Sequence, residues 1–171
     1  MARAVGENLG VEVFHLDRLW WQPGEYKIVG AGSVATYTMA EAEFLQLEKR
    51  IAVGETWVID SGVANIGIRL ARADTVILLD LPRWICTWRV IKRHNRRRPD
   101  YPDGVREGFG WLWLLLKWIW KTWPTERRPS VLSAIEEYGV DATVIHLHTR
   151  REVRSFLDGI GKGESALGRL I

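Results

Sequence analysis

Two short apolar runs, at residues 56–59 and 75–79, constrain the fold of this 171-residue chain more than any other feature. Each run consists mainly of β-branched and other apolar residues without polar alternation, and each is followed by an aspartate, Asp60 or Asp80. Such runs are typical of strands that are covered on both faces, as in a parallel α/β sheet. Ligands of these sheets bind at the carboxyl ends of the strands, so we expect a binding site near the two carboxylates. The alternative is that both aspartates cap the helices that follow.

The rest of the chain alternates between strand and helix patterns, which predicts the α/β class. Further strands are expected at residues 11–16, leading to Asp17, and at 143–147, with a small hairpin at 25–38. Helices are expected at residues 2–9, 39–53, 109–123 and 150–157, and at a segment that begins with Pro82. We expect one domain over residues 1–158, with a lid at about 93–108 and a disordered tail at 159–171.

A cluster of basic residues follows the second apolar run. Its members are Arg89, Lys92, Arg93, His94, Arg96, Arg97 and Arg98. The net charge of the chain is only +3, so this cluster is a local feature. Such a patch usually binds phosphate from a nucleotide, a nucleic acid or a lipid, although it could also be a solvated helix face. Nucleic acid is the less supported partner, because no aromatic residues interleave the cluster to stack on bases.

Several classes of protein are excluded or disfavoured by the composition. Cys86 is the single cysteine, which excludes disulfides within the chain and cysteine-rich zinc sites, and we expect it to be inert packing. The first ten residues lack the apolar stretch of a signal peptide, and no run reaches the roughly 18 apolar residues of a membrane span. We therefore expect a cytoplasmic protein.

Three other patterns have weaker functional interpretations. Residues 30–35, GAGSVA, fit a dinucleotide-binding fingerprint, but the β-forming residues after them argue against the helix that it requires. His146 and His148 share one face of an expected strand, yet two ligands make an incomplete metal site. The tryptophan-rich helix at 109–123 resembles a lipid-interface helix. We expect instead that its apolar stripe packs on the sheet: Trp111, Leu112, Leu115, Leu116, Ile119 and Trp123.

Five segments between His15 and Pro124 occur in an order that resembles a known family. They are HLDRLWWQPG, WVIDSG, LARADTVILLDLPR, RRRPDYPDGVREGF and WIWKTWP. This set is similar to the bacterial topology modulation proteins, also called adenylate-kinase-related kinases, which are P-loop proteins of the nucleotide-kinase type. The resemblance implies a three-layer fold around a parallel sheet of strand order 2-3-1-4-5. It also implies ATP-dependent phosphoryl transfer, with Mg²⁺, to a small-molecule or nucleotide acceptor.

The resemblance assigns roles to eight residues of this chain. Asp60 would hold Mg²⁺ through water, and Asp17 would hold or deprotonate the acceptor hydroxyl. Arg93, Arg97 and Arg98 would form a lid over the transferring phosphoryl group. The residues expected to bind the cofactor are Arg89, Thr149 and Arg150, the last two beside the adenine.

The sequence also departs from the family pattern. The 171 residues contain no GxxxxGK[ST] phosphate-binding loop and no strand before residues 2–10, so the central strand of the sheet is expected to be missing. We expect either an N-terminally truncated reading frame or a sheet that closes differently, and weak ATP binding at best. Ser61-Gly62 stands where the family has Gly-Asn, which affects the acceptor side. The alternative function is a non-catalytic module that binds an anionic partner, a nucleic acid or a membrane surface, through the basic lid and the tryptophan helix.

Overall fold

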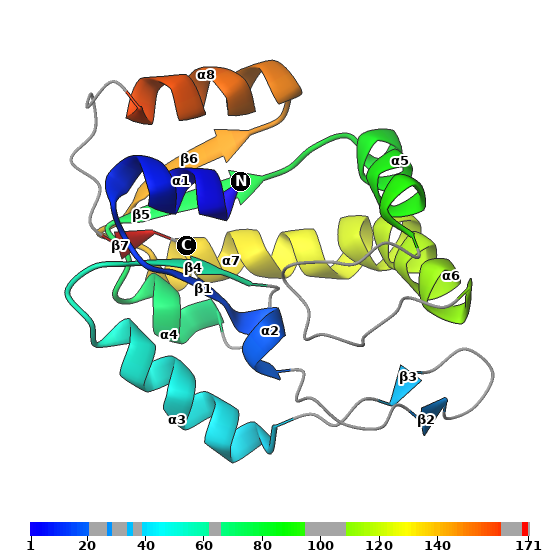
Figure 1. Ribbon diagram of the computed structural model, residues 1–171, viewed down its shortest axis with the longest axis horizontal. Coiled ribbons are helices and arrows are strands. Elements are labelled where there is room, and N and C mark those ends of the chain that lie inside the picture. Colours follow the sequence, from blue (N-terminus) through cyan, green and yellow to red (C-terminus); the bar gives the residue numbers. More distant parts are fainter. Residues whose placement is uncertain are drawn as a thin grey trace.

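The computed structural model describes residues 1–20, 27–28, 34–35, 39–61, 66–94, 109–161 and 169–170, and it confirms the α/β class (Figure 1). The helices are α1 Ala2–Leu9, α2 Leu16–Trp20, α3 Glu41–Ala52, α4 Ile66–Leu70, α5 Arg83–Arg93, α6 Phe109–Lys117, the π-helix η1 Trp118–Arg127, α7 Arg128–Tyr138 and α8 Arg150–Ile160. The strands are β1 Val13–His15, β2 Lys27–Ile28, β3 Val34–Ala35, β4 Trp57–Asp60, β5 Thr75–Leu79, β6 Thr143–Leu147 and β7 Arg169–Leu170.

Two parallel strand pairs form the two halves of the main sheet. β1 pairs with β4, with His15 opposite Asp60 at the end of the ladder. β5 pairs with β6 over five residues, from Thr75 opposite Thr143 to Leu79 opposite Leu147. All four strands were expected from their apolar runs, and β5 and β6 have the expected bounds. The pairing brings the residues that follow each strand to one edge of the sheet.

The two-residue strand β7 joins these halves, so the sheet closes differently from the family pattern, which is one of the two expected alternatives. The strand order is β1-β4-β7-β5-β6, with Leu170 opposite both Val58 and Thr75. The position between β4 and β5, expected to lack its strand, therefore holds β7, whose two residues belong to the segment 159–171 that was expected to be a disordered tail. Leu170 is fully buried, so burial of an apolar side chain fixes a segment that composition alone assigned to a frayed end. β7 pairs only with the amino-terminal parts of β4 and β5, so it does not reach the carboxyl ends of these two strands.

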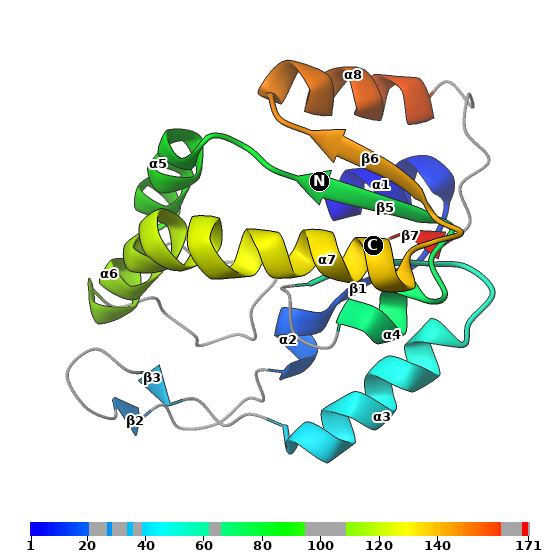
Figure 2. The same ribbon diagram turned by 180° about the vertical axis from the view of Figure 1, so that it is seen from behind.

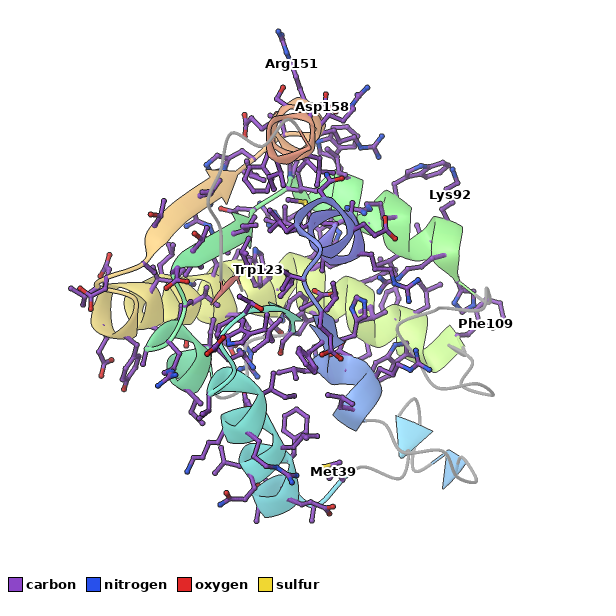
Figure 3. The ribbon with its side chains drawn as sticks, turned by 60° about the vertical axis from the view of Figure 1, so that its left-hand side comes forward. Met39, Lys92, Phe109, Trp123, Arg151 and Asp158 are labelled. Atoms are coloured by element: carbon purple, nitrogen blue, oxygen red, sulfur yellow. The ribbon has the colours of Figure 1, made fainter. Side chains whose placement is uncertain are left out.

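Helices cover the sheet on both faces and make three layers (Figures 1 and 2). On one face, α3, α4 and α7 enclose a core that includes Trp57, Ile59, Val76 and Leu78. On the other face, α1 and α8 cover a second core around Val58 and Leu170. The alternation of Trp57, Val58 and Ile59 between the two cores explains why all three positions are apolar. The outer surface of α8 is polar, and Arg151 points away from the molecule in Figure 3.

Most of the predicted helices are present, but α2 was not predicted and one helix continues beyond its expected end. Gly10, expected to end the first helix, adopts the left-handed conformation at the end of α1, with φ of 67°. Pro82 precedes α5, as its fixed φ suggested. The tryptophan helix was expected to end near Trp123, but helical structure continues through Pro124 as η1 and then as α7 to Tyr138. A wider π-helical turn accommodates a proline that would break an α-helix.

The small hairpin is confirmed by its two strands. β2 and β3 are antiparallel, with Lys27 opposite Ala35 and Ile28 opposite Val34. The dinucleotide fingerprint requires a helix at this point, and the strand at Val34–Ala35 contradicts it. The glycines at 30 and 32 lie outside the described residues.

Candidate functional site

A pocket of about 430 Å³ opens at the carboxyl ends of β1, β4 and β5. Four residues that the sequence singled out line it: Asp17, Asp60, Arg89 and Arg93. Asp17 lies in the first turn of α2 and Asp60 ends β4, while both arginines belong to α5. The start of α1, at Met1 and Ala2, forms another part of the wall. The pocket therefore combines carboxylates from one half of the sheet with guanidinium groups from a helix that follows the other half.

The carboxylate of Asp60 is bound by a histidine from the neighbouring strand. His15 Nδ1 lies 2.9 Å from Asp60 Oδ2, and Arg3 Nε donates to His15 Nε2 at 3.4 Å. Because Nε2 accepts, an imidazole with its proton on Nδ1 satisfies both contacts. The His15 side chain is 14% exposed and the Asp60 side chain 54% exposed. Asp60 therefore keeps a water-accessible face, as a residue that holds a hydrated cation must.

A fully buried ion pair within reach of the charge of Asp17 connects α3 to α4. Arg69 Nη1 donates to Glu48 Oε1, and both side chains are almost completely enclosed. Burial lowers the pKa of Arg69, and the charges of Glu48 and Asp17 oppose this change. Burial likewise raises the pKa of Glu48 despite the attraction of Arg69. Asp17 thus acts on the buried arginine as well as lining the pocket.

The two arginines of α5 also line a second pocket of about 480 Å³. They are four residues apart and so lie on one face of the helix. Trp88, Lys92 and Arg150 complete this second pocket. Of the three residues expected to bind the cofactor, the structure therefore brings Arg89 and Arg150 together. Thr149 has a structural role: its hydroxyl accepts from Glu152 N in a capping box that begins α8.

Arg97 and Arg98, and all but the first two residues of the expected lid at 93–108, lie outside the described residues. Ser61 lines the first pocket beside Asp60, and Gly62 lies outside the described part. Cys86 also lines this pocket, where burial raises the pKa of its thiol. A raised thiol pKa fits the expectation of an unreactive cysteine.

Asp80, the second strand-end aspartate, belongs to a different group of side chains. Arg128 Nε donates to Asp80 Oδ2 at 2.7 Å, and His146 Nε2 lies 3.1 Å from the same oxygen. Burial acts to raise the pKa of Asp80, but the hydrogen bonds and charges of Arg128 and His146 outweigh it and hold that pKa below its usual range. The capping alternative does not apply, because Pro82 is the N-cap of α5 and makes no side-chain cap bond.

The tryptophan-rich segment presents an exposed aromatic surface. All six residues of the expected stripe are half-buried or buried, and Thr122 is the one other residue of 109–123 that is. The stripe packs on α5, however, and none of the α6 residues, all of which the structure describes, is buried. Among the tryptophans whose side chains the structure describes, the most exposed are Trp113 at 73% and Trp120 at 50% in this segment, and Trp84 at 65% and Trp88 at 58% on the adjoining α5. Figure 3 shows Phe109 and Lys92 at this end of the molecule.

Sequence reasoning missed the partners of both aspartates. Arg3 and His15 were not connected with Asp60, and Arg128 lies in a helix that was not predicted. One signal was present: His15 and Asp60 end two strands of similar type, and a parallel register between those strands makes them neighbours. No comparable signal indicates Arg128, because 48 residues separate it from Asp80.

Comparisons of the chain with protein-family models, with curated proteins and with solved structures find no significant match. The resemblance to P-loop kinases is therefore a prediction that rests on the segments quoted above. Over the part of the chain that the structure describes, no helix is long and apolar enough to cross a membrane.

Proposed function

We propose that the pocket at the carboxyl ends of β1 and β4 binds a nucleotide phosphate with Mg²⁺ and that the protein is a nucleotide-kinase-like phosphotransferase. The observation that carries the proposal is the convergence of Asp17, Asp60, Arg89 and Arg93 on one concave site. Phosphoryl transfer is catalysed mainly by positioning and by neutralising charge. Carboxylates for a hydrated cation and guanidinium groups for phosphate oxygens are the groups that this chemistry needs.

Each residue has a role that suits its surroundings. Asp60, half-exposed and oriented by His15, would hold Mg²⁺ through water. Asp17 would accept a hydrogen bond from the acceptor hydroxyl. Arg89 and Arg93 line both adjoining pockets, so a phosphate between them could extend into either one. The sheet order supports the proposal, because β7 stands where the resemblance implies a central strand.

The strength of binding is limited by what the sequence contains. In P-loop proteins a glycine-rich loop supplies backbone N–H groups, a lysine and a hydroxyl to the phosphates, and these 171 residues include no such motif. We therefore expect weak binding of ATP and little phosphoryl transfer by this chain. Attaching a strand and a glycine-rich loop ahead of Met1 should strengthen both if the added strand displaces β7 from the position between β4 and β5.

Isothermal titration calorimetry with pyrophosphate and ATP, with and without Mg²⁺, tests the assignment. We expect Arg93→Gln to weaken binding of both ligands by about 10-fold or more, the loss of one charge-assisted contact. Asp60→Asn should remove the Mg²⁺ dependence and leave metal-free pyrophosphate binding unchanged. Arg151→Gln is the matched control, because it removes a positive charge from the outer face of α8. Equal effects of Arg93→Gln and Arg151→Gln would contradict a specific site.

The exposed tryptophans favour a second candidate, a non-catalytic module that binds an anionic surface. Trp84, Trp88, Ile91, Trp120 and Arg150 line a largely apolar pocket of about 510 Å³. Arg83 lies 5.1 Å from the ring centroid of Trp120. Aromatic rings beside Lys and Arg are typical of proteins that bind lipid interfaces.

Vesicle flotation separates the two candidates. The interaction module predicts binding to vesicles of phosphatidylglycerol and phosphatidylcholine that survives Asp60→Asn and is lost in Trp84→Ala with Trp88→Ala. The phosphotransferase predicts no vesicle binding and the Mg²⁺ dependence described above. Arg97→Ala with Arg98→Ala should abolish polyanion binding if the basic cluster is the contact.

A further inference from the structure

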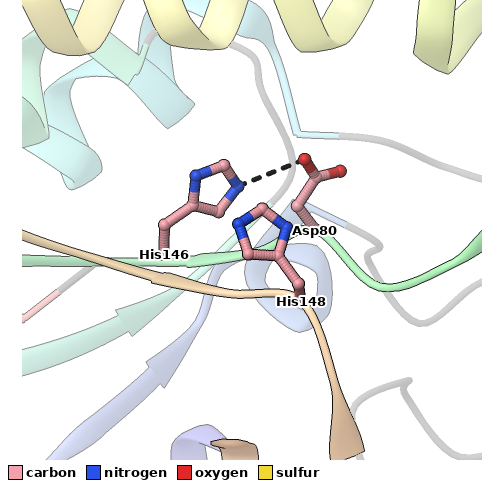
Figure 4. Close-up of side chains that lie close together, drawn as sticks. All are labelled: Asp80, His146 and His148. Atoms are coloured by element: carbon pink, nitrogen blue, oxygen red, sulfur yellow. Dashed lines mark hydrogen bonds and ion pairs between the residues drawn. The ribbon is translucent and has the colours of Figure 1, made fainter.

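A second group of chemically active side chains lies at the carboxyl ends of β5 and β6. The parallel register sets Leu79 opposite Leu147, so Asp80 and His148, the residues after them, emerge side by side. His146 is two residues before His148 and shares its face of the strand. Figure 4 shows both imidazole rings facing the carboxylate of Asp80. None of the three residues lines the pocket that holds Asp60.

The spacing of these side chains fits one small cation. A ligand atom from each of Asp80, His146 and His148 lies within 4.8 Å of the others. The pair His146 Nε2 and Asp80 Oδ2 is 3.1 Å apart, and the imidazole centroids are 4.0 Å apart. In a tetrahedral zinc site, with bonds of about 2.0–2.1 Å, neighbouring ligand atoms are roughly 3.3 Å apart. The group therefore needs only small side-chain rotations to surround an ion.

We propose that Asp80, His146 and His148 form a binding site for Zn²⁺ or a similar divalent transition metal. Two imidazole nitrogens and one carboxylate oxygen are typical of zinc and of other late first-row metals, whereas Mg²⁺ and Ca²⁺ prefer oxygen ligands. The ion takes the place of the proton between His146 Nε2 and Asp80 Oδ2, and the imidazole proton then lies on Nδ1. This site is independent of the phosphotransferase proposal.

The surroundings of the group are those of an open metal site. Asp80 is 12% exposed and His146 29% exposed, while His148 lies at the surface. Three protein ligands with a solvent-facing side leave the fourth position of a tetrahedral ion for water. Arg128 Nε donates to the same oxygen, Asp80 Oδ2, and holds the orientation of the carboxylate, as outer-shell groups do around metals. Its positive charge lowers the affinity of the site for a cation, so we expect exchangeable binding.

Untagged protein that has been stripped with EDTA provides the test. Zn²⁺ is titrated in competition with a chromogenic chelator, and Co²⁺ is used to detect tetrahedral coordination from its visible absorption. We expect one equivalent per chain, with affinity reduced by at least about 100-fold in Asp80→Asn, His146→Gln and His148→Gln, beyond the 10–100-fold range typical of outer-shell partners. His148→Gln is the decisive variant, because an exposed residue can change without unfolding the chain, as circular dichroism will verify.

Two control variants test whether His94 or Cys86 binds the zinc instead. His94→Gln removes a histidine that packs on Phe109, away from the group, and should bind zinc like the wild type. Cys86→Ser removes the single thiol and should also bind normally. The proposal is overturned if the wild type does not bind Zn²⁺, or if His148→Gln binds as tightly as His94→Gln. It is also overturned if Cys86→Ser, and not the substitutions of the three ligands, lowers the affinity for Zn²⁺.

Discussion

In the β1–β4 half of the sheet, His15 Nδ1 lies 2.9 Å from Asp60 Oδ2, and in the β5–β6 half, His146 Nε2 lies 3.1 Å from Asp80 Oδ2. Both aspartates follow or end a buried strand, and both histidines come from the neighbouring parallel strand. The surroundings differ, however. Asp60 is 54% exposed and faces a pocket, while Asp80 is 12% exposed and also binds Arg128.

This difference shows how one pair of residue types can acquire two chemical roles. An exposed carboxylate with one histidine partner keeps oxygen lone pairs for a hydrated cation or a ligand. An enclosed carboxylate with a guanidinium partner contributes to stability, since hydrogen bonds to charged groups are the stronger ones. Asp60 is thus suited to binding ligands through water, and Asp80 to direct contact with a metal ion or to holding helix α7 against the sheet.

The comparison assumes that β7 holds the two halves in one sheet, and Leu170→Ala tests this with the largest expected effect. Leu170 is 0% exposed and lies in the core between α1, α8 and the sheet. Removing a buried leucine side chain costs about 2–5 kcal/mol of unfolding free energy. Urea denaturation followed by circular dichroism measures the change.

Val144→Ala is the control for that measurement. Val144 lies on the edge strand β6 and is 45% exposed, so its truncation should change the unfolding free energy by about 0.5 kcal/mol or less. If Leu170→Ala has a similarly small effect, β7 does not join the halves.

The strands were predicted because they follow from local patterns, whereas the convergence of four site residues was expected from the family resemblance. Apolar runs without alternation identify buried strands, and parallel packing brings their carboxyl ends to one edge. Arg89 and Arg93 were expected on one face of a helix from their spacing alone. The half-buried stripe of the tryptophan helix also follows from helical periodicity.

What the sequence did not predict depends on contacts between distant segments. β7 has only two residues, and its pairing is decided by the space between β4 and β5 rather than by its own composition. Arg128 reaches Asp80 because helical structure continues through Pro124, against the usual preference of proline. His146 and His148 were expected on one strand face and were interpreted as an incomplete metal site, because the third proposed ligand, Asp80, is 66 residues from His146 in the chain. Only the strand register reveals it.

A matched pair of substitutions, Asp80→Asn and Asp60→Asn, tests the contrast between the halves directly. Asp80→Asn removes a charge that accepts hydrogen bonds from Arg128 and His146 in a partly buried site, so we expect a loss of about 1–3 kcal/mol. Asp60→Asn changes an exposed side chain, and we expect about 0.5 kcal/mol or less. Thermal and urea unfolding should be compared in the same buffer with EDTA.

The outcome that contradicts the contrast is equal destabilisation by the two substitutions. In that case burial and the arginine partner do not distinguish the two aspartates. A larger loss for Asp60→Asn would instead indicate that the His15–Asp60 contact stabilises the β1–β4 pair.

The smallest expected effect is the dependence of the Asp80 contribution on pH in metal-free protein. Burial raises the pKa of Asp80, and the hydrogen bonds and charges of Arg128 and His146 lower it. The second effect is larger, so the net change in the pKa is a decrease. Because the folded-state pKa lies below the unfolded value of about 3.9, the folded state binds fewer protons in acid. The stabilisation is therefore complete above about pH 4 and is lost as the pH falls through the folded-state pKa. In urea unfolding with EDTA, the difference between wild type and Asp80→Asn should shrink as the pH falls from 5 to below 4, whereas a difference that stays unchanged from pH 5 to 2.5 would mean that the charge of Asp80 contributes nothing.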